Sequence, residues 1–568
     1  MVNSRGKFLA ALLCASALLV CQSAKVKEPV VKVGGTTLGS ESLEAFRKVA
    51  GVYPAPTPYY FPAQRQSQTF MAECEAIYKY AGSKSAEIAK RVTSSPDWVW
   101  KQRYYASLLF FDLLVDNLGF TDKQLHEYYK KSAEEFRVTV TAADGKDSSY
   151  IPPFDSVKTQ VADHCFYSTH KPDSSFIAGL SDQDSVAVRN HWIYTVRSDS
   201  YRTDFFMRLL FKERTGSEYV DSLEQLVDND KVLTSADMDV ITTWLPESRK
   251  NMRKKDLAEW LFKWLAFSER AEKLGLTATP EFKSMIHWAQ RMEFAFEYLR
   301  TEVLPKLEPA DALSALDSVL AELIVYDNIG QVGKVDPRWV TQELNDIAKT
   351  RTSVAVDSAI YVIRKAVKVK FLQDDRRDDK DADPAALMAK ADSLREAASD
   401  PDMDADEAAK VMDEAEKFYH ILSTDFAFTE IGRKALGEMA KTLTDKYNAD
   451  PKQGKHLLTL AINAYRKSQK LEGGRPQKSG GGPDTASVLC NSYFLVGFTY
   501  DEHMKNYSLA EANYKWILRN EPKCALASDA EFMIQHLGEP MTSIEEIQGQ
   551  SMRQGREVDF DEGAGEAL

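Results

Sequence analysis

The amino-acid sequence predicts a mainly helical protein, with one short strand near its start and helical hairpins towards its C-terminus. Three observations support this fold class. Apolar residues recur at helical spacing through long segments such as residues 98–118 and 254–274. Glycine or proline stands where these segments end. Hydrophobic residues make up 44% of the 568 residues, which is enough to build buried cores between helices.

Residues 1–24 have the three parts of a secretory signal peptide. Arg5 and Lys7 form a basic start, residues 8–20 are uncharged and apolar, and small or polar residues follow. The apolar run is shorter than the ~20 residues that a transmembrane helix needs. We therefore expect export to the periplasm or the outer membrane of a cell envelope. A buried N-terminal helix is the alternative.

Cys21 stands where this apolar run ends. The segment Leu18-Leu19-Val20-Cys21 resembles the lipobox of bacterial lipoproteins, although Val20 stands where a small residue is usual. The resemblance implies that Cys21 is the lipid attachment site. Acyl chains that each bury CH₂ groups at about 0.8 kcal/mol would then hold the protein on a membrane. Cleavage after Ser23 is the alternative and would leave the protein free to diffuse.

The mature chain is expected to begin with a short strand and to continue in helices. Val31 and Val33 alternate with polar residues, Gly34-Gly35 supplies a turn, and Ser40 can begin the first helix. Prolines among aromatic residues in 51–63 predict an extended loop. Further helices are predicted at residues 66–81, at 98–118, and from the capping-box pattern Thr121–Gln124 to about Phe136.

A second helical unit is expected to follow. Its helices are predicted to begin at Thr234, at residue 254 and at Thr279. Leu118-Gly119-Phe120-Thr121 and Leu274-Gly275-Leu276-Thr277 occupy the same place in the two units, which indicates an internal duplication. The predicted division is a signal peptide at 1–24, helical units at 25–230 and 231–373, an acidic linker at 374–407, helical repeats at 408–540, and a polar, disordered tail at 541–568.

Three segments of the first half follow one another in a recognisable order. They are Val31–Ser40, Leu118–Phe136 and Pro153–Val161. In this order they resemble the opening strand, the helix that leads into the parvulin domain, and the segment after that domain in periplasmic folding factors of the SurA, PpiD and PrsA type, the parvulin-associated chaperones. The resemblance implies helical chaperone-like lobes that bind unfolded or partner polypeptides.

The chain departs from that family where the parvulin domain should lie. Only Arg137–Pro152 separates the second segment from the third, and the Gly-Gly-Asp-Leu-Gly signature of the domain does not occur. Prolyl isomerisation has a barrier of about 20 kcal/mol, and lowering it requires a preorganised apolar pocket that so short a segment cannot form. We therefore expect no catalytic residues. A divergent peptidyl-prolyl isomerase within residues 137–230 is the alternative.

A second resemblance lies near the C-terminus. The residues that carry it are Tyr493, Val496, Gly497, Tyr500, Ala510, Tyr514 and Pro522. Their spacing is similar to that of a tetratricopeptide repeat, or TPR. Helices predicted at 408–422, 429–447 and 455–471 should stack on it as less regular repeats. A generic helical hairpin is the alternative for the fold, and a structural TPR lipoprotein of an outer-membrane complex is an alternative for the function.

Composition narrows the classes of partner and cofactor. The net charge of −13 argues against a nucleic-acid-binding protein, which would need a clustered basic face. The nine histidines are scattered, the aspartates at 400–406 lack the glycine and glutamate of a calcium loop, and Gly474–Ser479 lacks a required glycine of a phosphate loop. We therefore expect no metal, no other cofactor and no small-molecule substrate.

Cysteines and tryptophans give two further expectations. Cys74, Cys165, Cys490 and Cys524 lie far apart, so isolated buried thiols are predicted, with a Cys490–Cys524 pair as the alternative. Tryptophans crowd the second unit at Trp244, Trp260, Trp264 and Trp288. Each is expected in a core, although a chaperone would also expose an apolar cradle between its lobes for its clients.

Overall fold

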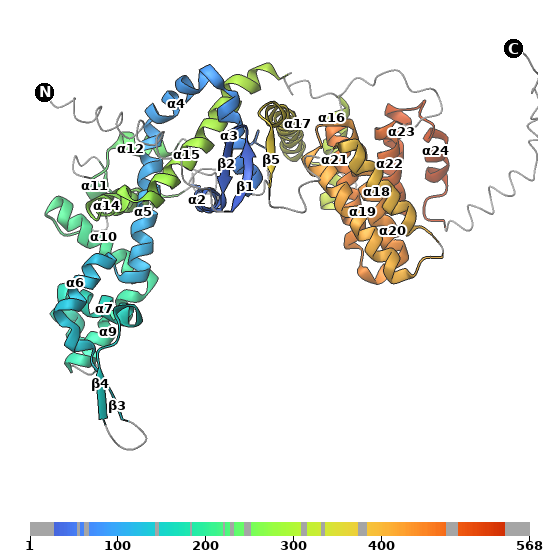
Figure 1. Ribbon diagram of the computed structural model, residues 1–568. Coiled ribbons are helices and arrows are strands. Elements are labelled where there is room, and N and C mark those ends of the chain that lie inside the picture. Colours follow the sequence, from blue (N-terminus) through green and yellow to red (C-terminus); the bar gives the residue numbers. More distant parts are fainter. Residues whose placement is uncertain are drawn as a thin grey trace, which may run out of the picture. The chain divides into compact units, whose positions relative to one another are not determined.

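The computed structural model describes residues 28–53, 57–61, 67–141, 147–181, 184–219, 222–227, 232–242, 252–307, 315–330, 335–372, 383–400, 402–472 and 487–539. Most of these residues lie in helices, and a small antiparallel sheet stands near the start, which confirms the mainly helical fold class (Figure 1). The chain forms two compact units. The first holds the described residues of 1–57 and 65–298, and the second holds those of 58–64 and 299–568.

The first unit begins with the predicted strand. Strand β1 (Pro29–Val33) pairs antiparallel with β2 (Thr36–Gly39), and Gly34 in the turn between them has a left-handed φ of 58°. Helix α2 (Ser40–Gly51) follows directly. Helix α3 (Ser67–Tyr80) is tied to the hairpin because Lys79 Nζ donates a hydrogen bond of 2.6 Å to the Val33 carbonyl.

Helix α5 (Pro96–Asn117) is the central helix of this unit, as its apolar residues on every side predict. It follows α4 (Ser85–Ser94) and ends at Leu118, which has left-handed backbone angles. Helix α14 (Lys254–Lys273) lies along α5, and α15 (Pro280–Tyr298) packs on α2, α3 and α4. The first unit therefore runs to Tyr298, whereas the sequence division placed a boundary at residue 230.

The rest of the first unit forms a helical lobe. Helix α6 (Asp122–Ser132) begins at the predicted capping box, in which the Thr121 and Gln124 side chains each bond the other residue's backbone N–H. Leu125, Phe136 and Val161 are buried together in its core. The other elements are β3 (Val138–Thr141), β4 (Asp147–Tyr150), α7 (Phe154–Thr169), α8 (Ser174–Ala178), α9 (Ser185–Arg197), α10 (Asp199–Thr215), α11 (Leu223–Leu226) and α12 (Ser235–Thr242).

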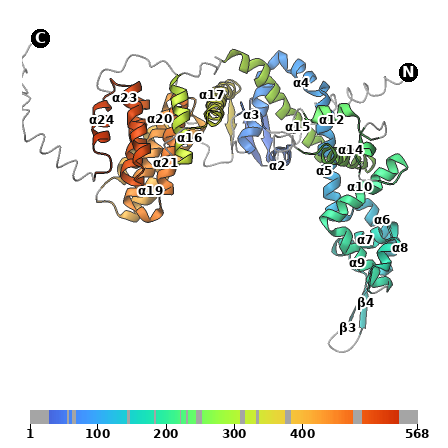
Figure 2. The same ribbon diagram turned by 180° about the vertical axis from the view of Figure 1, so that it is seen from behind.

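The second unit is a succession of packed helices. Each helix from α18 to α24 packs against the next, and α16 and α17 pack against α21 (Figure 2). Its elements are α16 (Ala315–Ile329), α17 (Pro337–Ala366), β5 (Val369–Phe371), α18 (Pro384–Ala398), α19 (Ala405–Asp425), α20 (Glu430–Ala449), α21 (His456–Glu472), α22 (Val488–Phe498), α23 (Tyr507–Asn520) and α24 (Ala527–Gln535). A short π-helix, η7 (Thr499–Met504), connects α22 to α23.

Part of the segment that the sequence division assigned to an acidic linker is helical. Helix α18 begins where the Asp383 side chain accepts a hydrogen bond from the Ala385 amide. It buries Leu387, Met388 and Ala391 in a cluster with residues of α19. The high density of acidic residues hides this short apolar stripe in the sequence.

The prediction for two of the cysteines was wrong. Cys490 of α22 and Cys524, in the turn after α23, form a disulfide with a Cα–Cα distance of 6.6 Å. Packing of α22 on α23 brings together two cysteines that lie 34 residues apart in sequence. Cys74 and Cys165 are buried free thiols, as expected.

Candidate functional site

The tryptophans of the predicted unit 231–373 lie mainly in the hydrophobic core of the first structural unit. Trp264 and Trp288 are buried, and Trp260 is partly buried with its ring centroid 4.1 Å from that of Trp264. Trp244 lies outside the described residues, as does Cys21, the predicted lipid attachment site.

Large apolar side chains are exposed on the lobe that contains α6, α7 and α9. Their exposed fractions are 39% for Val138, 47% for Val140, 54% for Tyr150, 52% for Val186 and 78% for Tyr194. Three of these residues belong to the β3–β4 hairpin and two belong to α9. Tyrosine and valine side chains exposed to this degree gain the most from being covered by a partner.

The β3–β4 hairpin is exposed along its whole length. Its antiparallel register pairs Val138 with Tyr150, Thr139 with Ser149, Val140 with Ser148, and Thr141 with Asp147. All eight strand residues are exposed. Since side chains alternate between the faces of a strand, Val138, Val140 and Tyr150 share one face of the hairpin. Figure 1 shows the hairpin extending away from α6, α7 and α9.

Contacts at its base hold the hairpin to the lobe. The Tyr129 hydroxyl donates a hydrogen bond to the Pro152 carbonyl just beyond β4. The Arg137 guanidinium, just before β3, pairs with Glu134 through two hydrogen bonds of 2.8 Å. Phe136 and Phe154, which flank the hairpin in sequence, are buried in the lobe core. The ends of the hairpin are thus fixed while its strands stay uncovered.

The hairpin lies in the short segment that joins α6 to α7. It lies between Arg137 and Pro152, and the described residues that follow it up to Val227 form helices α7 to α11. The sequence contained a signal for it that the sequence analysis missed. Val138-Thr139-Val140-Thr141 alternates, and Asp144-Gly145 is a dipeptide typical of hairpin turns.

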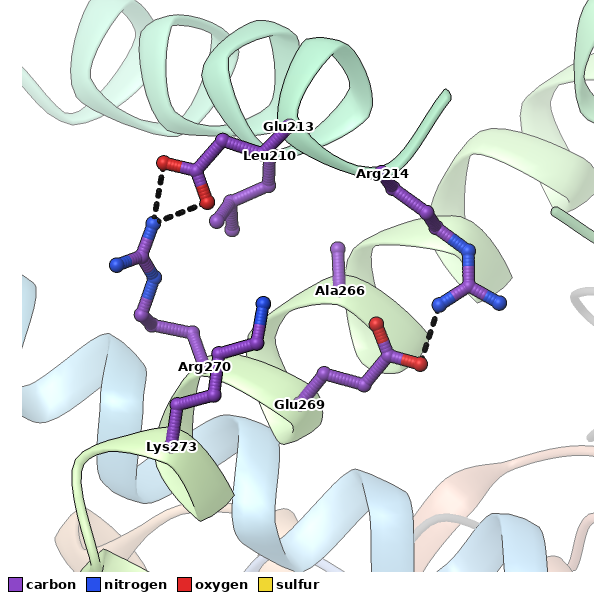
Figure 3. Close-up of a pocket in the computed structure, with 7 residues that line it drawn as sticks. All are labelled: Leu210, Glu213, Arg214, Ala266, Glu269, Arg270 and Lys273. Carbon is purple, nitrogen blue, oxygen red and sulfur yellow. Dashed lines mark hydrogen bonds and ion pairs between the residues drawn. The ribbon is translucent and has the colours of Figure 1, made fainter. Parts of the chain in front are cut away.

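A pocket lies between α10 and α14 (Figure 3). It has about 250 Å³ of empty space, part of which is open solvent. Glu213 accepts hydrogen bonds of 2.6 and 2.7 Å from Arg270, and Arg214 pairs with Glu269. The Lys273 ammonium points into the hollow, while Leu210 and Ala266 complete its lining.

The charged side chains that line this pocket mainly form ion pairs with one another. Both carboxylates are bound to arginines, and the lining contains no histidine, cysteine or hydroxyl group that could act as a nucleophile. Burial and the nearby Arg270 charge lower the pKa of His170, but His170 does not line the pocket. Partly exposed ion pairs of this kind contribute about 0–1 kcal/mol each. The pocket is thus lined by two arginine–carboxylate pairs, the Lys273 ammonium and two apolar side chains.

One group of potential metal ligands occurs in the described part of the chain. Donor atoms of Cys490, Glu521 and Cys524 lie within 4.8 Å of one another. The two sulfur atoms form the disulfide, so neither is available as a thiolate ligand. Burial raises the pKa of Glu521, whose carboxylate accepts a hydrogen bond from Ser487. The group is a disulfide with a neighbouring carboxyl group.

Comparison with known proteins assigns the chain to no family. No family model, curated protein or solved structure matches the chain. In the described residues, no helix combines the length and the apolar character needed to span a membrane. The exposed apolar residues of the lobe are therefore the feature on which a functional proposal can rest.

Proposed function

We propose that this protein is an exported chaperone or assembly scaffold that binds unfolded or partner polypeptides in a cell envelope, without catalysis, and that Cys21 anchors it to a membrane. One observation carries the proposal. The lobe of α6, α7, α9 and the β3–β4 hairpin exposes five large apolar side chains, Val138, Val140, Tyr150, Val186 and Tyr194. The signal-like N-terminus and the order of the family-like segments support it.

The mechanism is reversible burial of a partner's apolar segments. Covering apolar surface yields about 25 cal/mol per Å². A handful of half-exposed valines and tyrosines therefore gives a weak contact, which suits a protein that must release its clients. No bond is formed or broken.

Aggregation of an unfolded client tests the proposal. The mature protein should suppress aggregation of a urea-unfolded outer-membrane β-barrel protein after dilution, as measured by light scattering. A variant that removes the exposed apolar side chains of the lobe should suppress it several-fold less. Its substitutions are Val138→Thr, Val140→Thr, Tyr150→Ser, Val186→Thr and Tyr194→Ser.

A matched control removes exposed apolar side chains from the second unit. Its substitutions are Trp339→Ser, Val362→Thr, Leu460→Ser and Val488→Thr, at residues exposed by 48% or more. This control should suppress aggregation as well as the unchanged protein. Equal suppression by the lobe variant, or turnover of a prolyl peptide by the purified protein, would contradict the proposal.

A structural role in an outer-membrane complex is the second candidate. The observation that favours it is the succession of packed helices from α18 to α24, since stacked helical hairpins build extended binding surfaces. Co-purification with other envelope proteins at fixed stoichiometry would support this candidate over a chaperone.

The anchor is tested separately. Cys21→Ser should move the protein from the membrane fraction to the soluble fraction and abolish labelling by a radioactive fatty acid. Unchanged fractionation of that variant would remove the anchor from the proposal and leave polypeptide binding intact.

A further inference from the structure

We propose that the β3–β4 hairpin binds its partner by strand addition, in which an extended, uncharged segment of a client polypeptide pairs with an outer edge of the hairpin. This inference rests on the proposed function, because it assigns the binding mode to the same lobe. Four observations on the hairpin support it.

The first observation is the open edge. A two-stranded antiparallel ladder satisfies the inward backbone groups of each strand, and alternate residues direct their N–H and C=O groups outwards. Among the described strands, β3 and β4 pair only with each other, and all eight of their residues are exposed. Outward backbone groups at strand spacing are matched by another extended backbone.

The second observation is that the usual protection of an edge is missing. Soluble proteins block exposed edges with lysine, proline, bulges or covering elements, because a bare edge recruits other chains. Residues Val138–Thr141 and Asp147–Tyr150 contain neither lysine nor proline. Their four-pair register runs without a bulge. An edge that is left open in this way can accept a strand.

The third observation concerns charge. Asp147 is the single charged residue of the two strands, and its carboxylate accepts a hydrogen bond of 2.6 Å from Thr141. One face of the hairpin carries Val138, Val140, Tyr150 and Ser148, and the other carries Thr139, Thr141, Ser149 and Asp147. A segment that alternates apolar and hydroxyl residues complements both faces, whereas an acidic segment finds no counter-charge on the strands.

The fourth observation is size, which selects a client over a second copy of this chain. Each edge has four residues, so at ~3.3 Å per residue it is about 13 Å long. Pairing along such a length buries far less than the ~1,200 Å² of a stable interface. Because an isolated two-stranded hairpin is itself only marginally stable, a third strand stabilises it while bound and leaves readily.

Two synthetic peptides test the inference on the full mature protein. One is an uncharged ten-residue peptide of alternating valine and threonine, and the other has the same side chains with N-methyl groups on its four central amides. N-methylation removes the backbone donors and keeps the apolar surface. Strand addition predicts that methylation weakens binding at least tenfold, and that the first peptide slows hydrogen exchange of amides in residues 138–141 and 147–150.

A variant of the hairpin completes the experiment. Its strands 138–141 and 147–150 are replaced by glycine and serine, and its circular dichroism and thermal transition report whether the lobe remains folded. This variant should lose binding of the unmethylated peptide. Equal affinity for both peptides would show that only side chains are recognised, which overturns strand addition.

The remaining outcomes separate this inference from the proposed function. Full suppression of aggregation without binding of either peptide overturns strand addition and leaves the chaperone proposal standing. Failure of both assays overturns both. A dimer of the unchanged protein that becomes a monomer in the hairpin variant, as measured by light scattering, would assign the edge to self-association and also overturns the inference.

Discussion

At the scale of single residues, Gly497 shows how closely α22 and α23 approach. A Cβ atom at this position would lie 2.7 Å from Cε1 and 3.0 Å from Cδ1 of the Tyr514 ring. The ring is fully buried, so it has little room to move. We expect Gly497→Ala to lower the free energy of unfolding of the second unit by about 1–3 kcal/mol, as overpacking does elsewhere.

A second glycine provides the control for this prediction. Gly437 lies within α20, and a Cβ built on it has no described neighbour within 4 Å apart from the local backbone of its own helix. Gly437→Ala should therefore raise stability by about 0.5–1 kcal/mol, because alanine is the better helix former. Denaturant titration of both variants measures the contrast. A neutral effect of Gly497→Ala would contradict the close approach of Gly497 to the Tyr514 ring.

His287 gives stability a dependence on pH. Burial, together with the Arg291 guanidinium, lowers its pKa to about 4, against about 6.5 for an unfolded chain. Between these values the unfolded state binds more protons, so stability falls as the pH decreases from 6.5 towards 4, by up to about 1.4 kcal/mol per pH unit.

The test of this dependence is His287→Gln. The variant should lose less stability than the unchanged protein when the pH is lowered from 6.5 to 4.5, as measured by urea denaturation at each pH. All other titrating groups are common to both proteins, so the difference between the two curves isolates His287. Parallel curves would contradict the lowered pKa.

At the scale of elements, the Cys490–Cys524 disulfide fastens α22 to the turn after α23. The bond closes a loop of 34 residues, so chain entropy predicts a contribution of about 3–4 kcal/mol. The free energy of unfolding of the double variant Cys490→Ala/Cys524→Ala should be lower by about this amount. A reductant should destabilise the unchanged protein and leave the variant unaffected, and equal stability of the two proteins under oxidising conditions would refute the prediction.

Helix ends could be predicted from a few neighbouring residues in the sequence. Which helices pack against one another could not be predicted in this way. Thr121 and Gln124 predicted the start of α6, because a capping box is formed by residues within a four-residue segment. The packing of α14 on α5 joins segments far apart in sequence, and periodicity shows only that a face is buried. Cys490 and Cys524 were misjudged for the same reason, since their pairing depends on how two helices pack.

The candidate site was harder to predict than the fold. Apolar residues in a sequence indicate burial, so the pattern could not reveal that Val140 and Tyr194 stay exposed. Exposure depends on what the rest of the chain leaves uncovered. Cys21 remains a prediction, because it lies outside the described residues.

At the scale of the whole molecule, the division into two compact units predicts two separable stabilities. In the first unit, Lys101 Nζ lies 2.5 Å from Glu293 and 3.0 Å from Asp97, and its side chain is only 6% exposed. Lys101→Met would leave the Glu293 carboxylate, whose side chain is only 15% exposed, without this cation, so we expect a loss of about 3 kcal/mol. The disulfide lies in the second unit.

Each change should therefore act on one unit alone. Changes at distant sites with no shared partners are additive to within about 0.5 kcal/mol. In scanning calorimetry, Lys101→Met should lower the temperature of one transition, and the cysteine double variant should lower the temperature of the other. The triple variant, which combines these changes, should show both decreases at their full size. A single transition that moves with either change would mean that the two units unfold together. The chain would then have one cooperative core in spite of its two packed units.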